Sequence, residues 1–302
     1  MNPWFTDYSQ YLATLFPGVK VQKISVNTDR GCPNRDGTLG SGGCIYCNNQ
    51  SFTPAYCFGG KGITAQLEAG KKFFARKYPQ MKYLAYFQSF SSTYGRNAAD
   101  LKADLTEALD VEDVIGIVVG TRPDCVPDAV LDVLAEIGHK VPVIVEFGME
   151  SLHDRTLRLI NRGHDAATAV GSVSRAARRG LHVGVHLIAG LPGESESDIL
   201  ATVDAVCRLP VESIKMHQLQ VLRDTPLADM IDRGEVTLEP YTYEQYLELC
   251  EKIVHRVPRH IAIDRFLSTA PPEMVVMPKW GVKNYVFTDM LLKRLAENKL
   301  PV

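Results

Sequence analysis

Short apolar runs of strand length alternate with amphipathic stretches of helical length along most of this 302-residue chain. Strands are expected at residues 19–27, 82–90, 114–119, 143–149, 182–188 and 213–221. Helices are expected between them, at residues 63–78, 98–109, 128–137, 154–159, 165–179 and 196–208. This alternation is typical of a parallel sheet wound by right-handed crossovers. We therefore expect an α/β fold.

Six strand–helix units before residue 222 favour a partial, three-quarter (β/α)6 barrel over a full eightfold one. We expect an N-terminal segment at 1–18, the barrel at 19–222, and an α/β extension packed on it at 223–302. The extension is expected to hold helices at 243–255 and 285–298 and a strand at 261–266. Because parallel barrels carry their chemistry at the C-terminal strand ends, the long loop after the first strand is expected at the barrel mouth.

The composition is that of an ordinary globular protein, with 45% hydrophobic and 23% charged residues. No apolar stretch is long enough to span a membrane, and the N-terminus has no secretion signal. We therefore expect a cytoplasmic protein without a membrane partner, in which the seven cysteines are not disulfide-bonded. The net charge of −2 neither supports nor excludes a nucleic-acid partner.

Four cysteines cluster in one loop, at Cys32, Cys44, Cys47 and Cys57. Thiolates are the ligands that select zinc or iron–sulfur clusters. A cluster held by three thiolates leaves one iron open, which can chelate the amino and carboxylate groups of a ligand. The alternative is a zinc site made from all four cysteines. Structural zinc sites of this kind usually have two Cys-x₂₋₄-Cys knuckles, whereas this loop has only one.

The segment CPNRDGTLGSGGCIYCNN resembles the cluster loop of radical S-adenosylmethionine enzymes, in the branch related to the catalytic subunit of elongator. Its Cys-x₁₁-Cys-x₂-Cys spacing departs from the commoner Cys-x₃-Cys-x₂-Cys and is similar to that of the YhcC/YtqA-like subfamily. The similarity continues through GTRPDC, VEFGMES, INRGH, HLIAGLPGE and KMHQLQVLRDTPLA. It implies a partial barrel, a [4Fe–4S] cluster, and reductive cleavage of S-adenosylmethionine to a deoxyadenosyl radical.

The resemblance implies that Cys32, Cys44 and Cys47 hold the cluster and that Tyr46 lies over the adenine of the cofactor. Other side chains at the expected strand ends then become candidates for binding S-adenosylmethionine. They are Gln88 and Ser89 (with Ser91) for the methionine amine, Glu146 or Glu150 for the ribose, Ile188 and Gly190 for the adenine, and His217 and Gln218 near Lys215 and His186 in the interior.

Each of these assignments has a structural alternative. The serines can form a plain hydroxyl-rich turn, and Glu150 with Ser151 can cap the following helix. Gly190 can belong to a simple strand-to-helix turn, and a histidine in a strand is more often a satisfied core residue. Glu146 stands in an otherwise apolar run, so a carboxylate buried there must be paired or hydrogen-bonded.

The catalytic residues are not identified by the sequence, but four candidates follow from their positions. Arg122 and Asp124 end the third strand, where they can face the substrate or form an internal ion pair. Cys57 and Cys125 can supply a fourth thiolate or a hydrogen atom.

For the function, the resemblance favours radical chemistry on tRNA. It points to the wobble-uridine side chain and to a step from a 5-carboxymethylaminomethyl to a 5-aminomethyl group. The expected partners are tRNA and a reductant such as flavodoxin or ferredoxin. The chain lacks elongator's acetyltransferase domain, so acetyl transfer is not expected. The alternatives are radical chemistry on a small molecule or peptide, and a non-catalytic zinc-binding protein.

Overall fold

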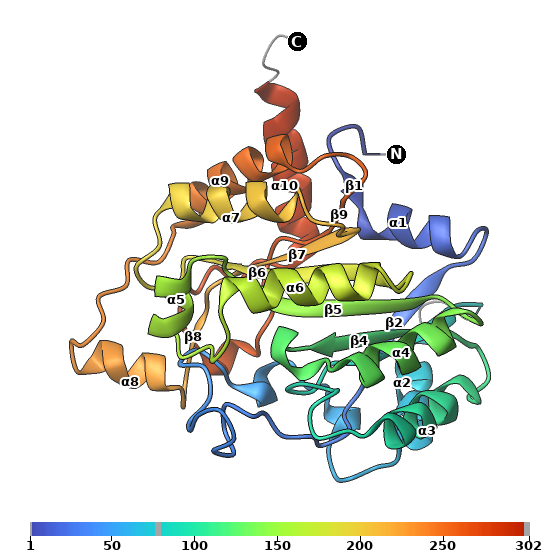
Figure 1. Ribbon diagram of the computed structural model, residues 1–302. Coiled ribbons are helices and arrows are strands. Elements are labelled where there is room, and N and C mark those ends of the chain that lie inside the picture. Colours follow the sequence, from blue (N-terminus) through green and yellow to red (C-terminus); the bar gives the residue numbers. More distant parts are fainter. Residues whose placement is uncertain (1, 76–79, 299–302) are drawn as a thin grey trace.

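The computed structural model describes residues 2–75 and 80–298. In these residues eight parallel strands form one sheet, in the order β1-β9-β7-β6-β5-β4-β3-β2, which curls into a half-barrel (Figure 1). The strands are β1 (Thr6–Asp7), β2 (Val21–Val26), β3 (Lys82–Phe87), β4 (Val114–Thr121), β5 (Val143–Glu150), β6 (His182–Ala189), β7 (Ser213–Gln218) and β9 (Ala262–Arg265).

The expected partial barrel is confirmed, because β2 to β7 pair in sequence order and every pair is parallel. Two further strands extend this sheet. The expected strand at 261–266 is β9, which pairs with β7. The short strand β1, which was not expected, pairs with β9. Segments from both ends of the chain therefore complete one edge of the sheet.

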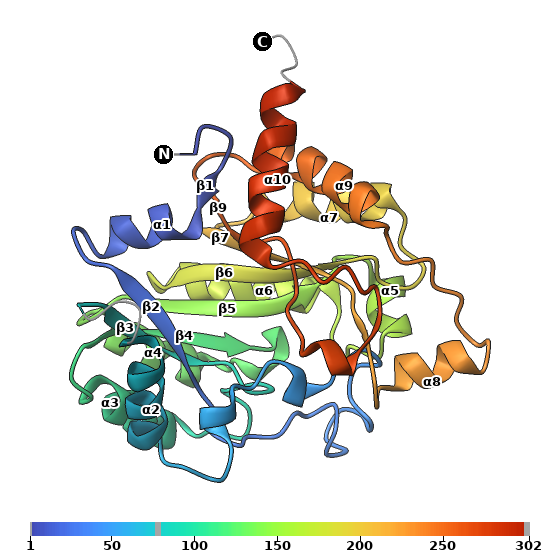
Figure 2. The ribbon, with the colours of Figure 1, turned by 180° about the vertical axis from the view of Figure 1, so that it is seen from behind.

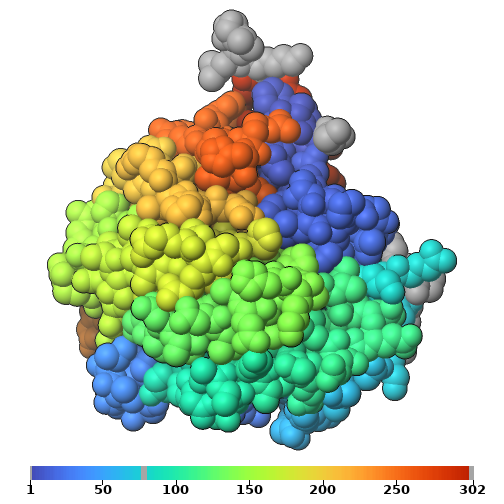
Figure 3. All heavy atoms as spheres, turned by 45° about the vertical axis from the view of Figure 1, so that its right-hand side comes forward, coloured from blue at the N-terminus to red at the C-terminus, as the bar shows by residue number. Residues whose placement is uncertain are grey.

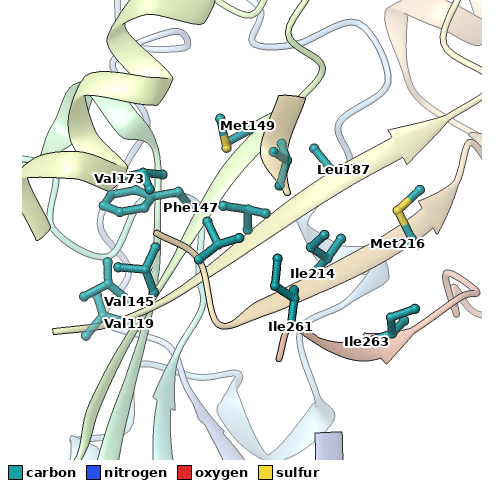
Figure 4. Packing of buried hydrophobic residues seen from close by; sticks show 14 of the residues in the cluster. Val119, Val145, Phe147, Met149, Val173, Leu187, Ile214, Met216, Ile261 and Ile263 are labelled. Atoms are coloured by element: carbon teal, nitrogen blue, oxygen red, sulfur yellow. The ribbon is translucent and has the colours of Figure 1, made fainter. Parts of the chain in front are cut away.

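Helices cover the convex face of the sheet, where the outward-facing strand residues form the main core. Figure 4 shows Phe147 of β5 beside Val173 of α6. The expected last residues of the first covering helix, 76–78, lie outside the described residues. The covering helices are α2 (Ile63–Ala75), α3 (Ala98–Leu109), α4 (Asp128–Gly138), α6 (Ala166–Ala177), α7 (Glu196–Val206), α9 (Tyr243–Arg256) and α10 (Asn284–Glu297).

Helix α1 (Tyr8–Leu15) packs across the end of the half-barrel at which the strands begin. Its aromatic residues form a second apolar cluster with inward-facing strand residues such as Leu84 and Val118. Gly116 makes room for this packing, because a Cβ there would lie 2.9 Å from a methyl carbon of Leu84. The barrel is therefore filled with apolar side chains at this end, and any open space lies toward the other end.

Short elements surround the opposite end, where the strands finish. They are α5 (Asp154–Leu159), α8 (Pro226–Asp232), β8 (Val221–Leu222), β10 (Val275–Met277), and the 3-10 turns Asn49–Ser51, Ala55–Cys57, Pro123–Cys125 and Pro272–Met274. Strand β10 pairs antiparallel with β8, which draws the segment after β9 to this end (Figure 2).

The N-terminal segment and the C-terminal part of the chain lie side by side on the surface (Figure 3). The pairing of β1 with β9 accounts for this arrangement. Among the described residues, no helix has the length and apolar character needed to cross a membrane.

Candidate functional site

A cavity of about 260 Å³ opens at the C-terminal ends of the strands, and Cys32, Cys44 and Cys47 all line it. The Cys44–Cys47 turn is closed by a hydrogen bond from the Cys47 amide to the Cys44 carbonyl (3.0 Å). Gly43 has a φ of 80°, and a Cβ there would lie 2.8 Å from Nε of Arg35. Glycine therefore lets the loop turn tightly enough for the three thiols to share one cavity.

Two buried arginines contact the thiols of Cys32 and Cys44. Nη1 of Arg122 lies 3.9 Å from Sγ of Cys32, and Nη1 of Arg162 lies 3.5 Å from Sγ of Cys44. Both guanidinium groups are almost completely shielded from solvent. A hydrogen-bond donor with a positive charge stabilises sulfur in its thiolate form, which is the form that binds metal.

The third thiol also has an arginine beside it. Burial and the nearby Cys44 raise the pKa of Cys47 to about 11, while Arg35 acts in the opposite direction through its charge and a hydrogen bond. Arg35 also donates from Nη2 to the backbone carbonyl of Cys47 (2.7 Å). Each of the three thiols therefore faces the cavity with one guanidinium group next to it.

The segment 160–164, which the sequence presents as INRGH, holds the cysteine loop in place. The amide of Ile45 donates to the carbonyl of Ile160 (3.1 Å), and Nδ2 of Asn161 donates to the carbonyl of Gly43 (2.8 Å). Arg162 follows directly and reaches Cys44. This short segment after α5 therefore fixes both the backbone and one sulfur of the loop.

Cys57 does not join the other three clustered cysteines. Its thiol donates to the carbonyl of Ser25 (3.2 Å), and it is not among the described residues that line the cavity. Within residues 2–75 and 80–298, no three His, Cys, Asp or Glu side chains converge closely enough to hold a single metal ion. A zinc ion needs its thiolates within about 2.3 Å of one point, whereas an iron–sulfur cluster spreads them over several irons. Because Cys57 lies apart from the three thiols that line the cavity, the structure does not support a zinc site made from all four cysteines.

Most of the side chains predicted to bind S-adenosylmethionine face the same cavity. Ser89 and Gly190 are not among its described lining residues: Ser89 is buried, and Gly190, with a φ of 88°, packs against Tyr241. The predicted residues that do line the cavity are Tyr46, Gln88, Glu146, Glu150, Ile188, His217 and Gln218.

The two glutamates of β5 have different surroundings. Glu146 is buried and accepts hydrogen bonds from Lys23 (2.5 Å), Tyr86 (2.7 Å) and His186 (2.8 Å). Burial alone would raise its pKa, but Lys215, Lys23 and His186 hold the pKa well below its ordinary value. Its oxygens are thus already occupied by protein donors.

Glu150 lies at the end of β5, closer to the cysteine loop. Its backbone has a φ of 66°, and its Oε1 lies 3.4 Å from Nη2 of Arg162. The other terminal nitrogen of Arg162, Nη1, contacts Cys44. Of the two glutamates, Glu150 is the better placed to accept the hydroxyl groups of a ribose bound beside the cysteines.

Arg122 and Asp124 form an internal ion pair, which is one of the two alternatives expected from the sequence. Nε and Nη2 of Arg122 donate to the two carboxylate oxygens of Asp124, at 2.9 Å and 2.8 Å. Arg122 also lines the cavity, whereas Asp124 and Cys125 are not among its described lining residues. Burial raises the pKa of the Cys125 thiol to about 11, which keeps it protonated at neutral pH. Asp124 therefore acts by orienting Arg122 toward Cys32.

Deeper in the barrel, four charged side chains form an inner ionic layer: Lys23 of β2, Glu146 of β5, Lys215 of β7 and Asp264 of β9. Nζ of Lys23 bridges Glu146 and Asp264, at 2.5 Å and 3.0 Å. Nζ of Lys215 lies 3.4 Å from Glu146 and 3.7 Å from Asp264. The layer ties the two edges of the curled sheet together and separates the cavity from the apolar packing around α1.

The sequence did not identify Lys23, Asp264, Arg35 or Arg162 as site residues. Lys23 stands in a predicted strand, where a charged residue among apolar ones signals an inward-facing partner. Arg162 belongs to the INRGH segment, which the sequence singled out without giving its residues a role.

A half-barrel with three thiols at its mouth is the architecture of an iron–sulfur enzyme that keeps one iron open. The chain matches the radical SAM superfamily over residues 26–206 and the radical SAM C-terminal domain over residues 211–297. It therefore belongs to the radical SAM superfamily, whose members use a [4Fe–4S] cluster and S-adenosylmethionine.

Relatives in this family cover most of the chain. YtqA of Bacillus subtilis is 34% identical, over 93% of this chain and 86% of its own. YhcC of Escherichia coli is 36% identical, over 87% of this chain and 83% of its own. A tRNA uridine(34) acetyltransferase of Methanocaldococcus infernus is 23% identical, over 62% of this chain and 34% of its own.

A solved structure supports the fold. The archaeal Elp3 of Methanocaldococcus infernus, with an N-terminal deletion, superposes with a TM-score of 0.68 at 19% identity. The match covers 93% of this chain and 64% of that one, so the chain spans less than two thirds of the solved Elp3.

The residues present fit the cluster. Three thiols line one cavity, and three guanidinium groups beside them offset the negative charge that thiolates bring. Nε of Arg162 is buried without a hydrogen-bond partner among the described residues, which leaves a donor available beside Cys44. Cys32, Cys44 and Cys47 would hold the cluster.

Replacing Arg162 with glutamine is expected to destabilise the protein and reduce cluster loading. The substitution removes the contact to Cys44 and the hydrogen bond to the Gly148 carbonyl. Leaving such buried groups without a partner costs about 2 kcal/mol of unfolding free energy. Urea unfolding of the apoprotein, and iron per chain after anaerobic reconstitution, measure the two effects. The exposed Arg158 on α5 provides the matched control, Arg158→Gln. Full iron content in Arg162→Gln would show that the arginine is not needed for cluster binding.

Proposed function

We propose that the chain cleaves S-adenosylmethionine reductively and uses the resulting radical to remodel the wobble-uridine side chain of tRNA. In the step proposed, the CH2 beside the nitrogen of a 5-carboxymethylaminomethyl group loses a hydrogen atom to the radical, and then a proton and an electron, which the one-electron carrier takes back. Water hydrolyses the resulting imine, which breaks the C–N bond and leaves a 5-aminomethyl group and glyoxylate. When bound, the two cofactors supply a one-electron cleavage that yields methionine and a 5′-deoxyadenosyl radical. The observation that carries the proposal is the meeting of three thiols, Glu150 and an open cavity at the barrel mouth.

The residues of the cavity have separate parts in this proposal. The three cysteines hold the cluster, and Glu150 accepts the ribose hydroxyls of the cofactor. Ile188 and Tyr46 provide apolar surface for the adenine, and both line the cavity. Gln88 is held by hydrogen bonds from its Nε2 to Ser25 and to the Phe52 carbonyl, both at 3.0 Å. Its side-chain oxygen is thereby oriented for a cofactor amine.

A tRNA substrate has two lines of support. One relative is named as a tRNA uridine(34) acetyltransferase. The other is Arg265, a basic side chain that lines the cavity and forms no ion pair with a carboxylate among the described residues, so that it favours an anionic substrate. We also propose that the electron comes from a flavodoxin or a ferredoxin, since both proteins deliver electrons one at a time. The proposed location is the cytoplasm.

Deleting the gene is expected to change the modified nucleosides of tRNA. Carboxymethylaminomethyl-type uridines should accumulate and aminomethyl-type uridines should fall. Mass spectrometry of digested tRNA from the deletion strain, with and without a plasmid copy of the gene, measures this change. A plasmid carrying Cys44→Ala should fail to restore the wild-type pattern. An unchanged pattern of wobble nucleosides in the deletion strain would contradict the tRNA proposal.

The second candidate is a small molecule or peptide as substrate, which the net charge of −2 fits without any general electrostatic attraction to RNA. Under this alternative, the purified protein would release deoxyadenosine with reductant while the tRNA of the deletion strain stayed normal.

A further inference from the structure

We propose that Lys215, His217 and Arg265 form a subsite that binds a carboxylate group of the substrate. This inference rests on the proposed function and deepens it, since a carboxymethylaminomethyl group carries a carboxylate. The three side chains come from β7 and β9, and all three line the cavity. Strand β2, which leads into the cysteine loop, lies at the other edge of the sheet. The subsite is thus built from different strands than the cluster site.

The strand pairing places the three side chains together. Arg265 is the register partner of Lys215 between β9 and β7, and His217 is two residues further along β7. Nη2 of Arg265 lies 3.4 Å from Nδ1 of His217. The same Nδ1 lies 3.1 Å from Oγ of Ser268, so the ring is held between the guanidinium group and this hydroxyl. Burial, Arg265 and the neighbouring His186 and Lys215 hold the pKa of His217 well below its ordinary value, so the ring is neutral.

Arg265 has one donor that the protein does not satisfy. Its Nε is buried and has no hydrogen-bond partner among the described residues. Buried donors are nearly always paired, so an orphaned one on a cavity wall indicates a ligand atom. Thr269 lines the same cavity, whereas the hydroxyl of Ser268 already donates to the Gln218 carbonyl (3.0 Å). The guanidinium group of Arg265 and the Thr269 hydroxyl thus offer donors for an acceptor-rich group.

The charge balance of this region fits an anion with one negative charge. Three cations, Lys23, Lys215 and Arg265, face two carboxylates, Glu146 and Asp264. Lys23 pairs closely with both carboxylates, which leaves one positive charge in excess on the Lys215–Arg265 side. Burial lowers the pKa of Lys215 to about 8, as expected for an ammonium group short of counter-charge. A carboxylate balances this excess, whereas a phosphate monoester brings up to two charges.

S-adenosylmethionine also carries a carboxylate, so the source of the group has to be decided. With a cluster bound, its open iron would chelate the cofactor's amino and carboxylate groups, so that this carboxylate would lie beside Cys32, Cys44 and Cys47. We therefore assign the Arg265 subsite to the substrate.

The test compares two anticodon stem-loop RNAs that differ only in the wobble nucleoside. One carries 5-carboxymethylaminomethyluridine and the other 5-aminomethyluridine. Binding is measured with cluster-loaded protein and S-adenosylmethionine, without reductant. The wild-type protein should bind the carboxylated RNA about 10-fold more tightly, and Arg265→Gln should bind both RNAs equally. Arg265→Lys keeps the charge but loses the planar fork, so its preference should fall between the two.

Controls separate this effect from misfolding and from cofactor binding. Arg233→Gln removes an exposed arginine that pairs with Glu235 and should behave as wild type. The affinity of each variant for S-adenosylmethionine is measured in parallel and should not change. Loss of cofactor binding in Arg265→Gln with the RNA preference intact would assign the subsite to the cofactor and overturn the proposal. Equal binding of the two RNAs by the wild-type protein would also overturn it.

A failure of the tRNA function can be told apart from a failure of the subsite. If neither RNA binds, the free nucleoside 5-carboxymethylaminomethyluridine is compared with its methyl ester, which lacks the negative charge. A preference for the acid that disappears in Arg265→Gln would keep the subsite and reject the tRNA substrate. No preference for the acid would reject the subsite.

Discussion

Alanine in place of Cys32, Cys44 or Cys47 is expected to abolish the iron–sulfur cluster. All three thiols line the same cavity, and losing one ligand leaves an iron without its anchor. Iron should fall from about four atoms per chain to less than one, together with loss of the brown colour. Iron analysis and visible absorption of anaerobically purified protein measure this. Deoxyadenosine formation with reductant should also disappear.

Cys57→Ala provides the control for these variants. Cys57 belongs to the same loop and is buried like Cys32 and Cys44, but its thiol donates to the Ser25 carbonyl, and it is not among the described residues that line the cavity. We expect the variant to keep its full iron content. Loss of iron in Cys57→Ala, to the same extent as in Cys44→Ala, would contradict the three-thiol site and make Cys57 a fourth thiolate ligand of the cluster.

The sequence predicted the barrel well because each of its strands and helices is encoded locally. The expected helices at 98–109 and 154–159 have the observed bounds, and the six barrel strands differ from expectation only at their ends. Strand β1 could not be predicted in this way. It has only two residues and exists because it pairs with β9, far along the chain. Helix α1 was also missed, although Asp7 and Gln10 form a capping box that the sequence already contains.

The features of the candidate site likewise fall into those encoded locally and those that depend on the fold. The cysteine spacing is local and predicted the three thiols that share the cavity. The arginine contacts are not local: 90 residues separate Arg122 from Cys32, and 118 separate Arg162 from Cys44. Only the fold brings these charges to the sulfurs. Glu146 is an intermediate case, because its place in an apolar run predicted that it must be paired, but not that Lys23 and Lys215 would be its partners.

Replacing Glu146 with glutamine is expected to lower the free energy of unfolding by about 3 kcal/mol. The carboxylate is the centre of the inner ionic layer, and its loss leaves Lys23 and Lys215 with Asp264 as their remaining carboxylate. A buried ammonium group without full compensation is strongly destabilising, even though glutamine has nearly the same shape as glutamate. Urea unfolding of the apoprotein at neutral pH measures the change.

Glu136→Gln is the matched control, because Glu136 makes an exposed ion pair with Lys102 and its loss should leave the unfolding midpoint unchanged. Adding Lys215→Met to Glu146→Gln removes one of the poorly paired ammonium groups, so the double variant should recover part of the lost stability.

The pH dependence gives a second check on the same residue. The folded-state pKa of Glu146 lies well below the ordinary value of 4.5. Its contribution is therefore complete above pH 4.5 and is lost as the pH falls toward the folded-state pKa. The stability difference between wild type and Glu146→Gln should accordingly be full at pH 7 and shrink in acid. A difference that stayed constant down to low pH would show that glutamine destabilises the barrel through packing rather than through the loss of charge.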